Sequence, residues 1–153
     1  MVVHVNGITI PYKDQHLTVC MLGHRGHLGY TEYLLRLTWS NGSWLIRGRY
    51  NAFNELHKKL KASVADKRGK RARWFPRFPK RHPFSSKLLG KNKEEDFIIK
   101  REKELRRYLE QVLIQMPDAL KNIHLDQFLN LSLRTQEIIE REKTWKEEEK
   151  KNF

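Results

Sequence analysis

The segment Arg47-Gly48-Arg49-Tyr50-Asn51-Ala52-Phe53 marks a change of period in the sequence. Residues 44–49 follow a strand pattern, whereas Phe53, Leu56, Leu60 and Val64 recur at spacings of three and four, as on one face of a helix. The pattern predicts a strand that ends in Arg47 and Arg49 and a helix that begins at Tyr50. The two arginines share a face of the strand, and the first amides of a helix carry partial positive charge. The junction therefore suits an anion such as a phosphate, although solvated arginines at a strand end fit the same pattern.

The residues before this junction predict a local antiparallel sheet. Asn6-Gly7 separates two β-rich runs and predicts a short N-terminal hairpin, because both positions tolerate the positive φ of a tight turn. Residues 17–22 form another strand pattern, and three glycines in 23–29 indicate a loop. Ser40-Asn41-Gly42-Ser43 then joins residues 30–39 to 44–49 in a longer hairpin.

The residues after the junction predict helices. Residues 94–115 carry the longest helical pattern, which ends at Met116-Pro117, and Arg101 falls on its apolar stripe. Either the stem of Arg101 packs on the core while its head reaches water, or its guanidinium faces a bound anion. One or two short helices follow up to Leu131. The tail 134–153 has balanced charge, and its apolar residues Ile138 and Trp145 continue a seven-residue spacing from Leu131.

The charge of the chain is strongly asymmetric. Its formal net charge is +13, from 31 lysines and arginines against 18 acids, and fourteen of these cations lie in residues 58–93 beside the single acid Asp66. A polyanionic partner is therefore expected, either nucleic acid or an anionic membrane surface. The sequence shows no secretory signal pattern and no long apolar run, so we expect a cytoplasmic protein with peripheral membrane contact. The single cysteine, Cys20, excludes an intrachain disulfide.

Residues 74–84 place three prolines among four aromatic residues and predict a stiff extended segment. Lys80 and Arg81 follow its Pro76-x-x-Pro79 bend and are projected at a fixed angle. The basic residues of the preceding loop, 65–73, supply only diffuse attraction by comparison.

Three stretches together resemble the Phox-homology (PX) domain of phosphoinositide-binding proteins such as sorting nexins, over residues 17–131. They are Arg49-Tyr50-x-x-Phe53-x-x-Leu56-His57-x-x-Leu60, Phe75-Pro76-Arg77-Phe78-Pro79-Lys80-Arg81, and Arg101-x-x-x-Leu105-x-x-Tyr108-Leu109 followed by Asp126-x-Phe128-Leu129. The resemblance implies an α+β fold in which a three-stranded antiparallel sheet packs on a helical subdomain. A proline-rich loop joins the first and second long helices. The expected organisation is an N-terminal hairpin extension (1–15), the PX-like domain (16–133) and a charged helical tail or linker (134–153).

The resemblance also implies roles for individual residues. Arg49 would bind the 3-phosphate of an inositol lipid, Tyr50 would lie against the inositol ring, and Arg101 would hydrogen-bond the ring hydroxyls. Arg81 would take the 1-phosphate, with Lys80 as the alternative. Membrane insertion is expected from the segment after the proline loop, at Pro83, Phe84, Leu88 and Leu89. Alternatively, these apolar residues pack on the domain. Gly48 departs from the family pattern, in which many members have a basic residue.

The resulting expectation is a non-catalytic module that targets phosphatidylinositol 3-phosphate on endosomal membranes, with no cofactor. Protein partners or self-association through the tail are further expectations. Two alternatives stay open: nucleic-acid binding by residues 67–84, where Trp74, Phe75 and Phe78 would stack on bases, and a degenerate PX-like scaffold for protein interactions. Cys20-x-x-x-His24-x-x-His27 offers three zinc ligand types without a fourth nearby, so we expect no metal site.

Overall fold

The computed structural model describes residues 1–65, 74–81 and 91–152. For residues 91–93 it describes the backbone alone. Its strands form one antiparallel sheet in sequence order, β1-β2-β3-β4-β5. The strands are β1 (Val2–Val3), β2 (Gly7–Tyr12), β3 (Gln15–His27), β4 (Tyr30–Trp39) and β5 (Gly42–Arg49). The α+β class is confirmed, but the expected three-stranded sheet is wrong, because this sheet has five strands.

The two additional strands come from the N-terminal hairpin. β1 pairs with β2, with Val3 opposite Ile8, so the connection is longer than the two-residue Asn6-Gly7 turn that the sequence predicted. β2 then pairs along its whole length with β3. Ile8 and Ile10 are buried in the main core, because pairing with β3 places them on its apolar face. The hairpin therefore extends the sheet.

β3 also runs further than predicted. It continues to His27 through most of the glycine-containing segment expected to be a loop, with an irregularity in the register between Met21 and Gly23. Pairing with β4 as far as His27 and Tyr30 leaves Leu28 and Gly29 as the turn, where Gly29 has a φ of 87°. The ladder satisfies the backbone groups that a loop would leave to water. The result is a long hairpin with Leu28 fully exposed at its tip.

The predicted β4–β5 hairpin is present and sets the position of the strand–helix junction, but β5 begins at Gly42, within the predicted connection of residues 40–43. Its turn is Ser40-Asn41, with Trp39 opposite Gly42 and Glu32 opposite Arg49. The first helix follows without a break, so the predicted change from strand to helix at Tyr50 is confirmed.

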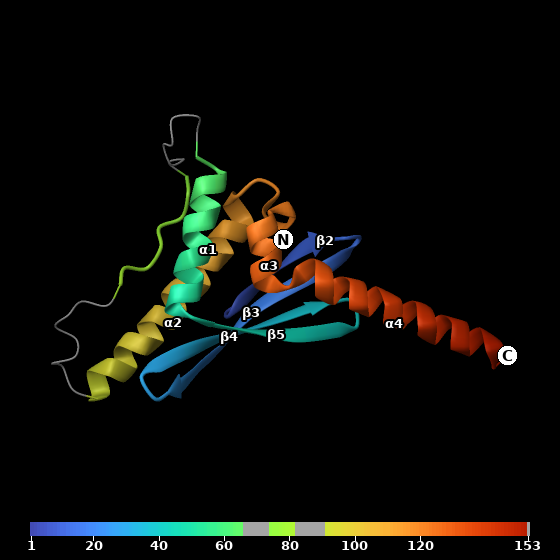
Figure 1. Ribbon diagram of the computed structural model, residues 1–153, viewed down its shortest axis with the longest axis horizontal. Helices are drawn as coiled ribbons and strands as arrows, with labels where there is room; N and C mark the ends of the chain where they lie inside the picture. The colour runs from blue at the N-terminus through green and yellow to red at the C-terminus, as the bar shows by residue number, and fades with distance from the viewer. Residues whose placement is uncertain (66–73, 82–90, 153) are drawn as a thin grey trace.

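The helices are α1 (Tyr50–Ser63), α2 (Lys91–Gln115), the 3-10 turn η2 (Ala119–Lys121), α3 (Ile123–Leu129) and α4 (Leu131–Lys151). Figure 1 shows α1, α2 and α3 gathered on one side of the sheet. The core lies between these layers, with Phe53 and Leu60 of α1 and Leu105 and Tyr108 of α2 almost fully buried. α2 ends where the sequence predicted and begins three residues earlier, at Lys91.

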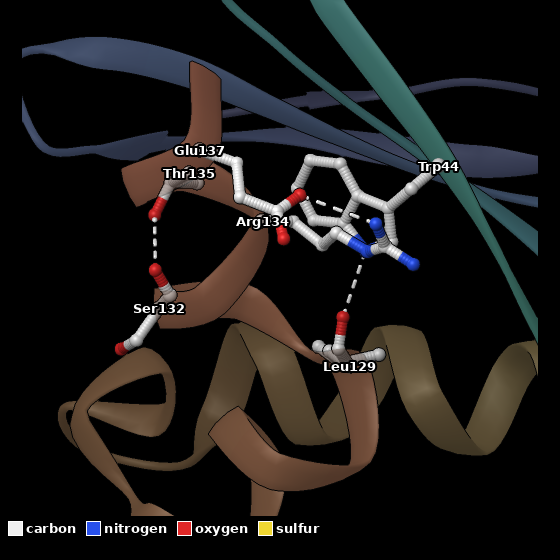
Figure 2. Close-up of polar contacts among 6 residues, drawn as sticks. All are labelled: Trp44, Leu129, Ser132, Arg134, Thr135 and Glu137. Atoms are coloured by element: carbon white, nitrogen blue, oxygen red, sulfur yellow. Dashed lines mark hydrogen bonds and ion pairs between the residues drawn. The ribbon is translucent and has the colours of Figure 1, made fainter. Parts of the chain in front are cut away.

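The junction of α3 and α4 is fastened to β5. The indole Nε1 of Trp44 donates a hydrogen bond to the carbonyl of Leu129, 2.8 Å away, as Figure 2 shows. The next residue, Asn130, adopts a left-handed conformation with φ of 51°, which ends α3 and lets α4 start in a new direction. Trp44 therefore sets where α4 leaves the domain.

The first half of α4 packs on the sheet, and the second half projects away from it (Figure 1). Ile138 is buried against Gly42, where an added Cβ would lie 2.5 Å from its Cδ1. Ser40 donates to Glu142 over 2.6 Å, whereas Trp145 is 63% exposed. Of the seven-residue series, Leu131 and Ile138 are thus core residues of this chain. Packing crosses the expected divisions near residues 15 and 133, and these divisions stay predictions.

Candidate functional site: a cation-lined junction of β5, α1, α2 and the proline segment

The site begins at the end of β5, where Arg49 caps α1 with an extended backbone and makes no side-chain cap hydrogen bond. Its guanidinium lies over the ring of Tyr30, with Cζ 4.3 Å from the ring centroid. Tyr30 itself stacks on His27, with ring centroids 4.7 Å apart. Glu32, opposite Arg49 on β4, pairs with His27. The one acid facing Arg49 across the hairpin is thereby engaged elsewhere.

Gly48, the departure from the family pattern, has a packing reason. It is buried, and a Cβ built on it would lie 2.9 Å from the Phe53 ring, which is fully buried at the start of α1. A lysine or arginine at this position would displace Phe53 from the core. Arg47, the other arginine of the junction, is exposed on β5. The close packing of strand and helix therefore leaves Arg49 as the cation next to Tyr50.

The proline segment, residues 74–81, is held against α1 and α2 by aromatic rings. Phe78 stacks on His57 with centroids 5.0 Å apart and meets Tyr108 edge-on at 5.0 Å. The hydroxyl of Tyr50 donates to the carbonyl of Pro79 at 2.7 Å. These contacts fix the end of the segment, where Lys80 and Arg81 project.

Arg101 is the central cation of the site. It is 8% exposed on α2, with its Cζ 3.9 Å from the centroid of the Tyr50 ring and 4.4 Å from that of Phe97. One of its nitrogens donates to the Lys80 carbonyl at 2.8 Å. The rings of Tyr50 and Phe97 and the Lys80 carbonyl thus stabilise a charge that lies on the otherwise apolar stripe of α2. A guanidinium has five N–H donors, and among the described residues the Lys80 carbonyl takes one of them, which leaves donors for a ligand.

The pKa shifts follow from this burial. Burial lowers the pKa of Arg101, and the nearby Arg81 lowers it further, against the opposite effects of Tyr33, Tyr50 and Glu104. Burial raises the pKa of Tyr50, which Arg101 and Arg81 oppose. Burial also raises the pKa of Tyr33, on β4, to about 12. The tyrosines are neutral and the arginine is charged at physiological pH, so the site presents positive charge beside polar rings.

The structure separates Lys80 from Arg81. The backbone of Lys80 accepts the Arg101 hydrogen bond, while its side chain is exposed. The Arg81 guanidinium lies 6.0 Å from the Tyr50 ring centroid and influences both Tyr50 and Arg101 electrostatically. Tyr50, Arg81 and Arg101 thus form one cluster, and Arg49 stands beside it with its head turned to Tyr30.

Two supporting residues escaped the sequence analysis. Phe97 lies one turn before Arg101 on α2, a spacing at which side chains meet. Tyr30 lies diagonally across the hairpin from Arg49, two residues beyond Glu32, and such diagonal neighbours are within reach of long side chains. The four-residue spacing on the helix could have indicated Phe97, and the register of the hairpin could have indicated Tyr30.

The expected insertion residues, Pro83, Phe84, Leu88 and Leu89, lie outside the described residues. No described helix is long and apolar enough to cross a membrane. Among the residues that the structure places, no group of three or more histidines, cysteines, aspartates or glutamates is arranged to hold a metal ion. His24, a residue of the weak zinc pattern, instead contacts Glu102 of α2 at 2.8 Å.

The aromatic residues of the proline segment do not favour the nucleic-acid alternative. Phe75 is buried, and Phe78 packs between His57, Tyr50 and Tyr108. Of the three proposed stacking residues, Trp74 is the one with an exposed ring. Base stacking would require the other two rings to leave the contacts that hold the segment.

The sequence model of the PX domain family matches residues 36–132, and the chain belongs to this family. The fold is similar to the X-ray structure of a designed CISK-PX domain, with a TM-score of 0.56 and 20% sequence identity over 72% of this chain and 96% of that one. The family match confirms the resemblance seen in the sequence. PX domains are in general non-enzymatic modules that target phosphoinositide-containing membranes.

Proposed function

We propose that the domain binds phosphatidylinositol 3-phosphate and recruits its protein to endosomal membranes that carry this lipid. The observation that carries the proposal is Arg101, a buried cation held between the rings of Tyr50 and Phe97 beside Arg81. Arg101 makes no ion pair among the described residues, and Glu104 acts on it only from a distance. A buried charge without an ion pair costs folding free energy, so an anionic ligand is its natural complement.

Each part of the headgroup has a group to meet it. In this proposal Arg49 and the first amides of α1 take the 3-phosphate, Tyr50 lies against the inositol ring, and Arg101 donates to ring hydroxyls. Arg81 takes the 1-phosphate, since its guanidinium is near Tyr50 and Arg101 whereas the Lys80 side chain points to solvent. The absence of a side-chain cap on α1 supports the first assignment, because its terminal amides need an acceptor.

The membrane itself would meet the end of the molecule that carries the β3–β4 hairpin tip and the start of α2, which lie at the same end in Figure 1. Leu28 is fully exposed there, next to His27 and close to Tyr30, which supports Arg49. Pro83, Phe84, Leu88 and Leu89 are the proposed insertion residues. Cations near an anionic leaflet add about 1 kcal/mol each to this attraction.

The test is Arg49→Ala in a liposome co-sedimentation assay with vesicles that contain phosphatidylinositol 3-phosphate, phosphatidylinositol 4-phosphate or neither. The preference for the 3-phosphate is expected to disappear while the circular dichroism spectrum stays unchanged, because Arg49 is exposed. Arg47→Ala is the matched control, from the same strand face. Undiminished 3-phosphate preference in Arg49→Ala would refute the assignment.

A second experiment separates this function from the two alternatives. Titration with soluble inositol 1,3-bisphosphate should shift the amide resonances of Arg49 and Tyr50 in a saturable way. A nucleic-acid-binding domain or a protein-interaction scaffold would leave these two amides unchanged at the same ligand concentrations.

A further inference from the structure

A groove of about 570 Å³ lies between the proline segment and the outer side of α2. Five of its lining residues are cations, and Glu104 is the single acid among the lining residues that the structure describes. Its lining residues are Arg77, Phe78, Pro79, Lys80, Arg81, Phe97, Lys100, Glu104, Arg107, Tyr108 and Gln111. Arg49, Tyr50 and Arg101 are not among them, so the groove adjoins the proposed headgroup site and shares its Lys80–Arg81 edge without being part of it.

The two walls of the groove run in opposite directions. Arg101 contacts the carbonyl of Lys80 near one end, and Phe78 packs on Tyr108 near the other. Lys80, Arg81 and Lys100 therefore belong to the end nearer the start of α2, and Arg77 and Arg107 to the other end. The cations form two clusters, one at each end of the groove.

The spacing of the clusters follows from helix geometry. Lys100 and Arg107 are seven residues apart on α2, which corresponds to about 10 Å along the helix axis. Between them the walls are apolar, with Phe78, Pro79 and Tyr108. Glu104 also lies between them, where it approaches Lys100 to 3.9 Å. A matching ligand carries negative charge at two points about 10 Å apart and an apolar group in between.

The cations of the groove are available to such a ligand. Within residues 1–65, 74–81 and 91–152, Arg77, Lys80, Arg81 and Arg107 take part in no ion pair. Lys100 has one weak pair, with Glu104, and its side chain is 77% exposed. All five are held on a helix or on the proline segment that the aromatic rings fix, so the clusters keep their separation when the ligand is absent.

We propose that this groove is a docking site for an extended acidic peptide segment of a partner protein, with two carboxylates three residues apart and an apolar residue between them. In a polyproline II conformation, residues i and i+3 point the same way and are about 9 Å apart, which matches the two clusters. Glu104 repels a continuous polyanion at the centre, which disfavours nucleic acid and favours the spaced pair of acids.

The probe is a dye-labelled synthetic peptide with the core Glu-Pro-Leu-Glu, measured by fluorescence anisotropy at 0.05 and 0.15 M salt. Saturable binding is expected, at least tenfold tighter than that of the same peptide with both glutamates replaced by glutamine. A peptide with its two glutamates adjacent should bind more weakly than the spaced one. Equal binding of the spaced and glutamine peptides would overturn the proposal.

The groove is assigned by the double variant Arg77→Glu and Arg107→Glu, which is expected to weaken peptide binding at least tenfold. Lys103→Glu is the matched control, because Lys103 is an exposed cation of α2 outside the groove. Glu104→Gln should reduce the difference in affinity between the spaced peptide and a peptide of four consecutive glutamates, because it removes the central negative charge of the groove. Thermal unfolding of each variant checks that a loss of binding is not a loss of fold. The melting temperature should stay unchanged, because Arg77 and Arg107 are exposed.

The headgroup variant keeps the groove distinct from the lipid site. Arg49→Ala should bind the Glu-Pro-Leu-Glu peptide as tightly as the unmodified domain, and the groove variant should keep its preference among phosphoinositide liposomes. If the groove variant instead loses binding to phosphatidylserine vesicles and retains the peptide, the groove is a membrane surface and the proposal is wrong.

Discussion

Arg101 and Arg49 belong to two regions of the candidate site that hold their cations by different means. Arg101 sits in the helical region, buried and enclosed by Tyr50, Phe97 and the Lys80 carbonyl. Arg49 sits at the edge of the sheet, exposed and supported by the single ring of Tyr30. The helical region is fixed by core packing, whereas the sheet region is fixed by a surface contact. Variants should therefore affect the two regions unequally.

The largest expected effect on lipid binding comes from Arg101→Leu. Leucine fits the apolar stripe of α2, and replacing a buried charge with an apolar side chain is often neutral or stabilising. We expect the free energy of unfolding to stay within about 1 kcal/mol, while affinity for phosphoinositide liposomes falls at least tenfold, about 1.4 kcal/mol. Urea denaturation and liposome co-sedimentation measure the two quantities.

Arg101→Lys sharpens this test, because it keeps the charge and removes the planar fork. The affinity of Arg101→Lys for phosphoinositide liposomes should remain well below that of the unmodified domain. A variant Arg101→Leu that unfolds readily yet binds lipid normally would show that Arg101 serves only the fold.

The second effect concerns the stability of the buried region at alkaline pH. Burial raises the pKa of Tyr33 to about 12, from an ordinary value near 10, with Glu102 adding to the shift and Arg101 opposing it. The neutral phenol is favoured in the folded state, so its contribution is complete below pH 10 and is lost as the pH rises from 10 to 12. Two pKa units at about 1.4 kcal/mol each correspond to a full loss of about 3 kcal/mol.

Urea denaturation of the domain and of Tyr33→Phe at pH 8, 10 and 11 measures this contribution. The variant should lose less stability than the unmodified domain between pH 10 and 11, because phenylalanine does not ionise. Parallel losses in the two proteins would contradict the assignment to Tyr33.

The smallest effect is expected in the sheet region, from Tyr30→Ala. An exposed cation–π contact contributes about 0.5–1 kcal/mol, so affinity for soluble inositol 1,3-bisphosphate should fall about two- to fivefold. Tyr30→Phe keeps the ring and should bind as the unmodified domain does. Binding to phosphatidylserine vesicles should be unaffected by either change, since Tyr30 positions Arg49 and carries no charge. An alanine variant with unchanged headgroup affinity would show that Arg49 needs no support.

Local patterns predicted the elements that depend on neighbouring residues. The hairpin between residues 30–39 and 44–49 and the change of period at Tyr50 were both predicted, because a hairpin and a helical face are short-range features. The predicted connection, residues 40–43, was two residues too long. The anomalous position of Arg101 was visible for the same reason. The two missed supports, Tyr30 and Phe97, follow from the same hairpin register and helical spacing.

The pairing of β2 with β3 was not predicted, although only two residues, Lys13 and Asp14, separate the strands. Both residues adopt positive φ, but neither is the glycine that usually marks such a turn in a sequence. The extension of β3 to His27 was hidden by its glycines, which have low strand propensity but are held by the ladder with β4. The fit of Gly48 against Phe53 is likewise a matter of two elements meeting. Each of these features depends on how one element packs or pairs with another, and such contacts leave no period in the sequence.

The sequence by itself determined that a basic strand end meets a helix at Arg49-Tyr50, that Arg101 interrupts an apolar stripe, and that a stiff proline segment carries Lys80 and Arg81. Only the tertiary structure decided that Arg101 meets the Tyr50 ring and the Lys80 carbonyl, and that the proline segment and α2 enclose a second basic groove. The reason is physical: period and charge are properties of neighbouring residues, whereas the partner of a side chain is set by which distant surfaces the core brings together.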